Sequence, residues 1–443
     1  MTKTLPINRS DPPPASTQLT KKARTTACSP WPSLPADIAG EVLLRLPSYA
    51  DRICFGAACR SWRASAAQHH APPRLPCLVF PDGSFGAFPW GHRPFRLPRA
   101  AGHHVCCGEW LVFKRDGDGD GGYYLANPFS DDAAAAVVAP APLPSLSAAR
   151  VHDEPAGAAR ERVLEEYDVT GLVLRGLDGD GVEPAPRTAS LRKLVVCSAA
   201  GLVAAVVGEG RLGKLALCRP GAAAWWVCGR GDHQWRRLKD IATHRGDLYA
   251  VDHNEDLLAV TVDHNNDGAG GPTVSGIRRV INGDPPDLEM ARSFTLHYLV
   301  DAGNDDDLLM VRREVRTANI PGRFVGVEER LTVFRADFAS SRWAEVTTLG
   351  DGGVALFVGQ WGSRAVRAPD EHRKWWTDQI FILDDGAGDQ PVWSPQYSLS
   401  VYDMGLWRTF KILHVMQRDG NTLWPGTWLF PRQGTRDAAD AAR

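Results

Sequence analysis

Short apolar runs separated by turn residues recur along most of this chain and constrain its fold more than any other feature. Seventeen such runs follow Pro73, and most contain four to eight residues rich in Val, Leu, Phe, Tyr and Trp. Runs of this length and composition favour β-strands. Glycine and aspartate, which are typical of turns, separate them. Only residues 157–167 read as a short helix, so we expect a mainly β fold.

The number of short strands also predicts how their edges are protected. A chain with many short strands hides its sheet edges by closure or by radial repetition, as in a β-propeller. At about 45–50 residues per four-stranded blade, the roughly 360 residues after Pro73 predict six to eight blades. The hairpin pattern of Gly246–Asp263 supports this prediction. Because the repeats are degenerate, a two-sheet sandwich remains an alternative.

The region before residue 72 has a helical pattern instead. Ser33 is a suitable helix cap, and Pro35 suits a first helical turn. Four apolar residues then follow at helical spacing on one stripe: Ile38, Val42, Leu43 and Leu46. A second helix is expected from about Ala50 towards Trp62. Because isolated short helices are marginal in water, this unit needs a partner or the rest of the chain.

These changes in composition predict four segments. Residues 1–29, rich in Pro, Ser and Thr, are expected to form a disordered tail. Residues 30–72 form the helical module and residues 73–432 the β domain. Residues 433–443 are expected to form a flexible tail.

Charge and apolar content argue against two classes of partner. The formal net charge is −2, so no overall field points to nucleic acid or an anionic membrane. The longest nearly apolar run, Leu194–Val207, is shorter than the roughly 20 residues that span a bilayer. The N-terminus has no apolar signal sequence. We therefore expect reduced cysteines and a cytoplasmic and/or nuclear location.

Several short segments match cofactor-binding or metal-binding motifs only in part. Gly208–Gly213 fits the GxGxxG pattern, but the strand-like Lys214–Cys218 follows where a dinucleotide site needs a helix. Two Asp-rich loops, at 116–121 and 263–268, lack the twelfth-position Glu and flanking helices of an EF-hand. There is no GxSxG, HExxH or CxxC. The sequence therefore predicts no cofactor, no metal and no catalytic residues.

The helical region, Trp31–Ala66, resembles the F-box. The matching elements are Leu34-Pro35, the apolar helix ending in Leu43–Leu46, Asp51, and the closing Ala58–Arg63. The resemblance implies that this module binds an adaptor of the Skp family, which is attached to a cullin. The adaptor-binding residues expected from it are Leu34, Pro35, Ile38, Val42, Leu43 and Leu46. Packing of these leucines against the β domain is the alternative, and Trp62 is assigned to the core of the module.

The rest of the folded chain resembles the KIB-type β-propeller domain of plant F-box proteins. The matching stretches are Trp110–Ser130, Lys214–Trp226, Gly246–Asp252, His297–Arg313, Leu331–Gly359 and Asp378–Asp385. The expected fold is thus a six- to eight-bladed β-propeller preceded by a small all-α F-box module. The resemblance implies a non-catalytic substrate receptor of an SCF-type ubiquitin ligase, whose propeller holds an unknown target protein.

Aromatic and cationic residues after Val358 are candidates for contact with that target. Exposed Trp and Arg are favoured binding anchors. The candidates lie on a segment that reads as non-strand: Trp361, Arg364, Arg367, Arg373, Trp375 and Trp376. Their alternative role is packing within the blade. The alternative function is a stand-alone propeller that binds a small molecule or glycan in its central channel, or a hydrolase built there.

Overall fold

The computed structural model describes most of the region between Trp31 and Pro431. The described residues are 31, 34–46, 49–68, 75–86, 95–115, 122–128, 141–146, 150–152, 161–163, 190–197, 201–208, 213–228, 238–263, 271–285, 293–302, 307–320, 323–350, 352–368, 373–383, 398–414, 416–419 and 422–431. Outside these residues lie the two predicted tails, Ser33, the Asp-rich loop at 116–121 and all of the loop at 263–268 except Asp263.

Three helices precede the strands: α1 (Ala36–Arg45), α2 (Tyr49–Ala58) and α3 (Arg60–Gln68). Pro35, and not Ser33, is the N-cap of α1. The prediction of one helix running towards Trp62 was wrong, because the helix is interrupted at Cys59 and α3 begins at Arg60. The Trp62 amide donates to Cys59 Sγ over 3.5 Å, so this side chain caps the start of α3.

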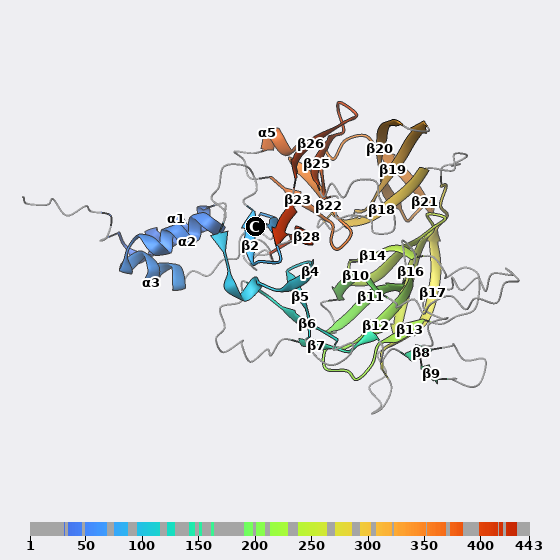
Figure 1. Cartoon of the computed structure of the whole chain (residues 1–443), viewed down its shortest axis with the longest axis horizontal. Helices are drawn as coiled ribbons and strands as arrows, with labels where there is room; N and C mark the ends of the chain where they lie inside the picture. The colour runs from blue at the N-terminus through green and yellow to red at the C-terminus, as the bar shows by residue number, and fades with distance from the viewer. Residues whose placement is uncertain are drawn as a thin grey trace, which may run out of the picture.

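The strands form six blades and one separate hairpin (Figure 1). Blade 1 contains β29 (Thr427–Leu429), β1 (Cys77–Val79), β2 (Ser84–Gly86) and β3 (Phe95–Arg96), and the 3-10 helix η2 (Pro98–Ala100) follows it. Blade 2 contains β4 (His103–Cys107), β5 (Trp110–Lys114), β6 (Tyr123–Ala126) and β7 (Ala141–Leu143). Blade 3 contains β10 (Ser190–Cys197), β11 (Leu202–Gly208), β12 (Lys214–Cys218) and β13 (Trp226–Cys228), with β8 (Arg150–His152) and β9 (Glu161–Val163) at its outer edge.

The remaining blades follow in chain order. Blade 4 contains β14 (Leu238–His244), β15 (Asp247–Asp252), β16 (Leu257–Asp263) and β17 (Thr273–Ile281). Blade 5 contains β18 (Ser293–Asp301), β19 (Leu308–Ile320), β20 (Arg323–Asp337) and β21 (Arg342–Val346). Blade 6 has the order β23 (Arg364–Arg367), β22 (Val354–Val358), β24 (Gln379–Leu383), β25 (Ser398–Asp403) and β26 (Arg408–His414), and the short helix α5 (Arg373–Trp376) precedes β24. The separate hairpin is β27 (Met416–Asp419) and β28 (Thr422–Pro425).

The blades close into a ring, which confirms the propeller and excludes the sandwich. The last strand, β29, pairs antiparallel with the first, β1, with Leu429 opposite Cys77. The first strands of successive blades are neighbours around the ring: β29, β4, β10, β14, β18 and β22. Six apolar clusters fill the spaces between adjacent blades, one for each pair, so the core is a continuous ring.

Sequence patterns placed several strands correctly and missed others. Six blades fall within the predicted range, and Gly246–Asp263 is the expected antiparallel hairpin. Strands β11 and β12, on either side of Gly208–Gly213, pair antiparallel, which agrees with a hairpin, although residues 209–212 lie outside the described residues. Residues 161–163 are strand and not helix. The segment after Val358, read as non-strand, contains β23 and α5.

Candidate functional site

The first helix of the module is formed by residues that suit it. Asp37 in its first turn and Arg45 in its last complement the helix dipole. Arg45 also forms an exposed ion pair with Glu41 at 2.6 Å, four residues earlier, which stabilises the helix by about 0.3–0.5 kcal/mol. Arg52 Nε of α2 donates to the Leu46 carbonyl over 3.1 Å, so the end of α1 is tied to the second helix.

The six predicted adaptor-binding residues fall into an exposed and a core-facing group. Ile38 and Val42 are 47% and 38% exposed, and Pro35 is also exposed. Leu43 is only 3% exposed and belongs to the core of the module. Leu34 and Leu46 are half-buried against that core. The exposed members, at positions 35, 38 and 42, form an apolar stripe along one face of α1.

Aromatic residues close the other side of the module. Trp62 stacks on Phe55 with ring centroids 4.5 Å apart and meets Trp31 edge-on at 6.3 Å. Its indole Nε1 donates to the Trp31 carbonyl over 3.0 Å, so its polar atom has a partner. Trp62 therefore packs within the module, as expected.

The module does not use the propeller to cover its apolar stripe in the described part of the chain. Its apolar cluster consists of module residues alone: Ala39, Leu43 and Phe55, with Leu34, Leu46, Trp62 and Ala66 packed against them. Figure 1 shows the three helices at one side of the molecule, beside the ring of blades. Packing of these leucines against the propeller, the alternative raised by the sequence, is therefore not seen among the described residues.

The hairpin of β22 and β23 occupies the centre of the ring. Its tip, residues 359–363, meets the first strands of blades on the opposite side. The Trp361 ring lies edge-on to His104 of β4 at 6.1 Å, and Gln360 Nε2 donates to the Arg192 carbonyl of β10 over 3.4 Å. A Cβ at Gly362 would lie 3.4 Å from the Phe430 ring. This hairpin takes up space in the channel where the alternative function placed a ligand.

Arg364 follows this tip and is half-buried. Burial lowers the pKa of its guanidinium, and the nearby carboxylates of Asp301 and Glu109 oppose that effect. Trp361 is half-buried against the cluster between blades 2 and 3. Both residues therefore contribute to the packing at the centre of the ring.

The remaining target-binding candidates lie at the other end of blade 6. Phe357 pairs with Arg364 and Val354 with Arg367, so the hairpin separates Trp361 from Arg367 by the length of β22. That length is about 13 Å for four steps along a strand. The structure thus does not bring the six candidates together on one loop.

The two adjacent tryptophans at this end have opposite environments. Trp375 is 76% exposed, and Arg373 beside it is exposed as well. Trp376 is 2% exposed and packs against Phe357 and Phe381, with ring centroids at 5.3 and 5.7 Å. Trp376 therefore has no surface to offer a partner.

Sequence reasoning missed a buried ionic cluster between blades 4 and 5. Glu255, in the turn before β16, accepts hydrogen bonds from His297 Nε2 at 2.7 Å and Arg312 Nε at 2.8 Å. Burial raises the pKa of Glu255, but these hydrogen bonds outweigh it and hold the pKa below its usual value. Glu255 and His297 are both buried, so the cluster links the blades and gives a substrate no access. Residues 253–256 read only as a turn, which left no signal for it.

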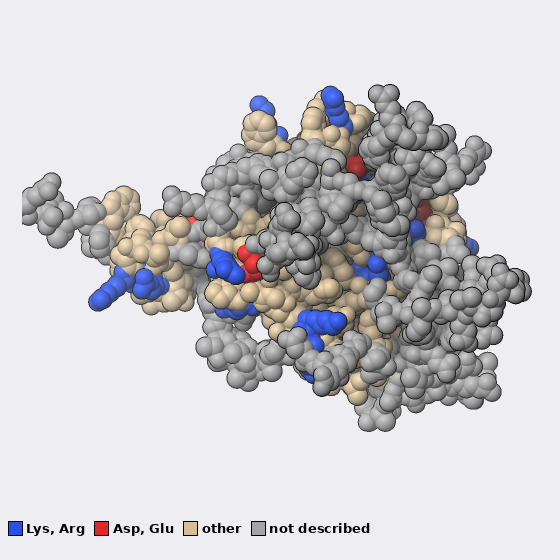
Figure 2. Space-filling view, in the orientation of Figure 1, with Lys and Arg blue, Asp and Glu red and all other residues tan. Residues whose placement is uncertain are grey.

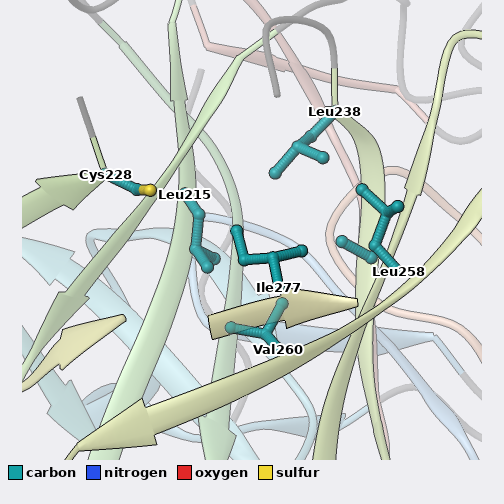
Figure 3. Close-up of a pocket in the computed structure, with 7 residues that line it drawn as sticks. Leu215, Cys228, Leu238, Leu258, Val260 and Ile277 are labelled. Carbon is teal, nitrogen blue, oxygen red and sulfur yellow. The ribbon is translucent and has the colours of Figure 1, made fainter. Parts of the chain in front are cut away.

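An apolar crevice lies between blades 3 and 4 (Figure 3). It measures about 290 Å³ including the part open to solvent, and its lining is Leu215, Cys228, Leu238, Ala250, Leu258, Val260 and Ile277. Small-molecule sites combine an apolar lining with a few polar groups that orient the ligand. The Cys228 thiol is the sole polar side-chain group in this lining, so the crevice gives no basis for catalysis.

The described residues carry no sign of a metal site or of a membrane-spanning helix. These contain no group of three or more His, Cys, Asp or Glu side chains arranged to hold a metal ion. None of the helices that the structure describes has the length and apolar character needed to cross a membrane. His103 is buried and its neighbour His104 exposed, so the two rings lie on opposite faces of β4, as expected for adjacent strand residues.

Comparison with known proteins identifies the propeller. A search of curated proteins finds no match to this chain. Residues 88–403, however, match the sequence profile of the KIB1-4 beta-propeller. That match covers well over half of the 443 residues and spans strands from all six blades. The chain therefore belongs to the KIB1-4 beta-propeller family.

Proposed function

We propose that this chain is the substrate-recognition subunit of an SCF-type ubiquitin ligase. Its helical module binds a Skp-family adaptor and, through it, a cullin. Its propeller binds the target protein. The chain supplies no catalytic residue for ubiquitin transfer, and it acts by holding the target near a ligase that other subunits assemble. This role places it in the cytoplasm and/or the nucleus.

The exposed stripe on α1 carries the proposal. Pro35, Ile38 and Val42 lie at helical spacing on a module whose sequence resembles the F-box. Recognition of a helix in a groove uses apolar anchors at such spacings. An uncovered apolar face on a small module is a feature of binding surfaces. The family of the propeller supports the second half of the proposal, a domain that holds another molecule.

Substitution of the stripe tests this proposal. Replacing both Ile38 and Val42 by Ser removes two anchors, each contributing about 1.5 kcal/mol when buried in an interface. We expect adaptor binding to weaken on the order of 100-fold. Titration of the full chain with purified adaptor measures the change. Helical content should not fall, because both side chains are already exposed.

Two comparison variants make the result specific. Ala64→Ser combined with Ala67→Ser changes two exposed residues of α3 and should leave adaptor binding intact. Leu34→Ala combined with Leu46→Ala should abolish binding while the propeller stays folded, but these leucines also pack against the module core. Undiminished adaptor binding by the Ile38/Val42 variant would remove the basis of the proposal.

The alternative function has no observation in its favour among the described residues. A ligand-binding or hydrolytic propeller needs convergent polar groups around an accessible pocket. The β22–β23 hairpin lies at the centre of the ring, and the crevice between blades 3 and 4 is apolar. The adaptor titration discriminates between the two functions, because a stand-alone propeller has no use for the stripe.

A further inference from the structure

Apart from Phe338 in blade 5, the exposed large apolar side chains of the described chain lie in two places. One is the helical module, with Trp31, Ile38 and Val42. The other is blade 6, where four such residues have large exposed fractions: Trp375 76%, Leu406 65%, Trp407 58% and Phe410 45%. Isolated exposed apolar residues are ordinary, but a group of them marks an interaction surface.

Strand register brings three of these residues to one end of blade 6. Gln379 pairs with Asp403, and the Met404 amide donates to the Asp378 carbonyl over 3.1 Å. The turn that holds Leu406 and Trp407 is therefore beside the start of β24. Two residues separate that start from the end of α5. Phe410 follows on β26. Figure 1 shows α5 and β26 on the same side of the molecule.

A second turn in the same propeller shows that this turn does not require apolar residues at its last two positions. Asp403 pairs with Arg408 across four turn residues, as Asp337 pairs with Arg342 in blade 5. In each turn the aspartate Oδ1 accepts an amide three residues on, from Leu406 at 2.9 Å and from Ser340 at 3.0 Å. Blade 5 has serine at both positions where blade 6 has Leu406 and Trp407.

The backbone at Trp407 strengthens this comparison. Its φ is 53°, and that of Ser341 at the matching position is 52°. A bulky residue rarely adopts this left-handed conformation. An exposed tryptophan in a conformation that disfavours it points to a role other than folding.

Buried neighbours in the sequence hold the exposed residues in place. Met404, in the same turn, is 6% exposed and joins the apolar cluster between blades 5 and 6. Trp376 similarly anchors α5 beneath Trp375. The surface is thus fixed in place, which reduces the entropy cost of binding a partner.

Among the described residues of α5 and of the turn Asp403–Arg408, the exposed charged side chains are cationic. Arg373, Lys374 and Arg408 are exposed. The two nearby carboxylates are half-buried and accept hydrogen bonds from backbone amides: Asp378 from Leu349, which lies between blades 5 and 6, and Asp403 from Leu406. Figure 2 shows Lys and Arg side chains at this edge of the molecule, beside uncharged surface. Such a rim favours a partner of negative charge.

We propose that Trp375, Leu406, Trp407 and Phe410, with their cationic rim, form the surface that binds an acidic segment of the target protein carrying aromatic or aliphatic anchors. This proposal rests on the function proposed above and deepens it. The apolar side chains supply the affinity, and the cations select an acidic segment and its orientation.

A peptide selection tests it without knowledge of the target. A displayed library of random 16-residue peptides is selected on the full chain. We expect enriched peptides to combine Asp or Glu with Trp, Phe or Leu. Binding of these peptides should fall at least tenfold with Leu406→Ser and Trp407→Ser, which copy the blade 5 turn and so should fold. Binding should also weaken when salt is raised from about 0.05 to 0.3 M.

The outcomes separate this proposal from the proposed function. Ile38→Ser with Val42→Ser is the matched control, since it also replaces two exposed apolar residues by serine; it should lose the adaptor and keep the peptides. Enrichment of neutral or basic peptides, enrichment of none, or equal binding to the Leu406/Trp407 variant overturns the docking surface. Self-association of the chain that this variant abolishes would assign the surface to a second copy and likewise overturn it. Failure of adaptor binding alone overturns the function and leaves the surface standing.

Discussion

The helical module and blade 6 both expose apolar side chains, but they hold them in different ways. In the module, which exposes Ile38 and Val42, the apolar cluster among the described residues has three buried members, Ala39, Leu43 and Phe55. On blade 6, Trp375 lies over a cluster of thirteen buried residues shared with blade 1. A small core gives little stability of its own. We therefore expect partner binding and folding to be coupled in the module and separable on the blade.

The adjacent tryptophans of α5 give the largest test of this separation. Trp376→Ala removes a buried indole and should lower the free energy of unfolding of the propeller by about 4 kcal/mol. Trp375→Ala, one residue earlier and exposed, should change it by no more than about 0.5 kcal/mol. Urea denaturation of the full chain measures both. Equal losses would mean that the exposed surface of blade 6 also holds the fold together.

The converse test is made in the module. Leu43→Ala should lower the free energy of unfolding of the module by about 3 kcal/mol, because Leu43 is one of the three buried residues described in its apolar cluster. We expect fast amide hydrogen exchange across α1, α2 and α3, with unchanged exchange in the propeller strands. Ile38→Ala is the control, because its side chain is already exposed. Retained protection of the three helices in the Leu43 variant would show that something beyond this core supports the module.

Low pH should reduce the stability of the propeller through a buried histidine, by less than the substitutions above. Burial lowers the pKa of His103 in blade 2 to about 4, while the unfolded chain takes up this proton near pH 6.5. The unfolded state therefore binds more protons below pH 6.5, and this residue should cost the propeller about 2 kcal/mol between pH 7 and pH 5. Asp252, whose pKa burial raises to about 6, acts in the opposite direction.

The variant His103→Asn isolates the histidine contribution. Its asparagine can still donate to the Ala100 carbonyl, which His103 Nδ1 meets at 2.9 Å. Melting curves from pH 7 to pH 5 should show a smaller loss of stability for the variant than for the parent chain. An identical pH dependence would mean that His103 is not buried as a neutral group.

Much of the fold follows from the sequence, because strand length and turn residues are local properties. Two errors have a common cause in charged strands. The run Glu328-Glu329-Arg330 reads as a break between two strands, yet β20 is continuous there. Glu314 of β19 lies opposite Arg330 of β20, so two residues of opposite charge face each other across the strands. Likewise β23, with an arginine at each end, lacks the apolar alternation that marks a strand.

The candidate surfaces were less predictable, because a pattern cannot tell which side of a stripe faces the core. Val42 and Leu43 are neighbours on α1, and only the positions of α2 and α3 bury the second and expose the first. Leu406 and Trp407 have the same difficulty. Their exposure depends on a turn that Met404 and Asp403 hold in place. An apolar residue type by itself favours a buried position, so it does not predict this exposure.

The most direct test of the account is amide hydrogen exchange of the full chain with and without the purified Skp-family adaptor. The account predicts slower exchange over Leu34–Leu46, since adaptor binding covers the stripe and stabilises a module with a small core. It also predicts unchanged exchange in blade 6, including Trp375 and Trp407. No protection in the module at saturating adaptor, or protection confined to the propeller, would contradict it.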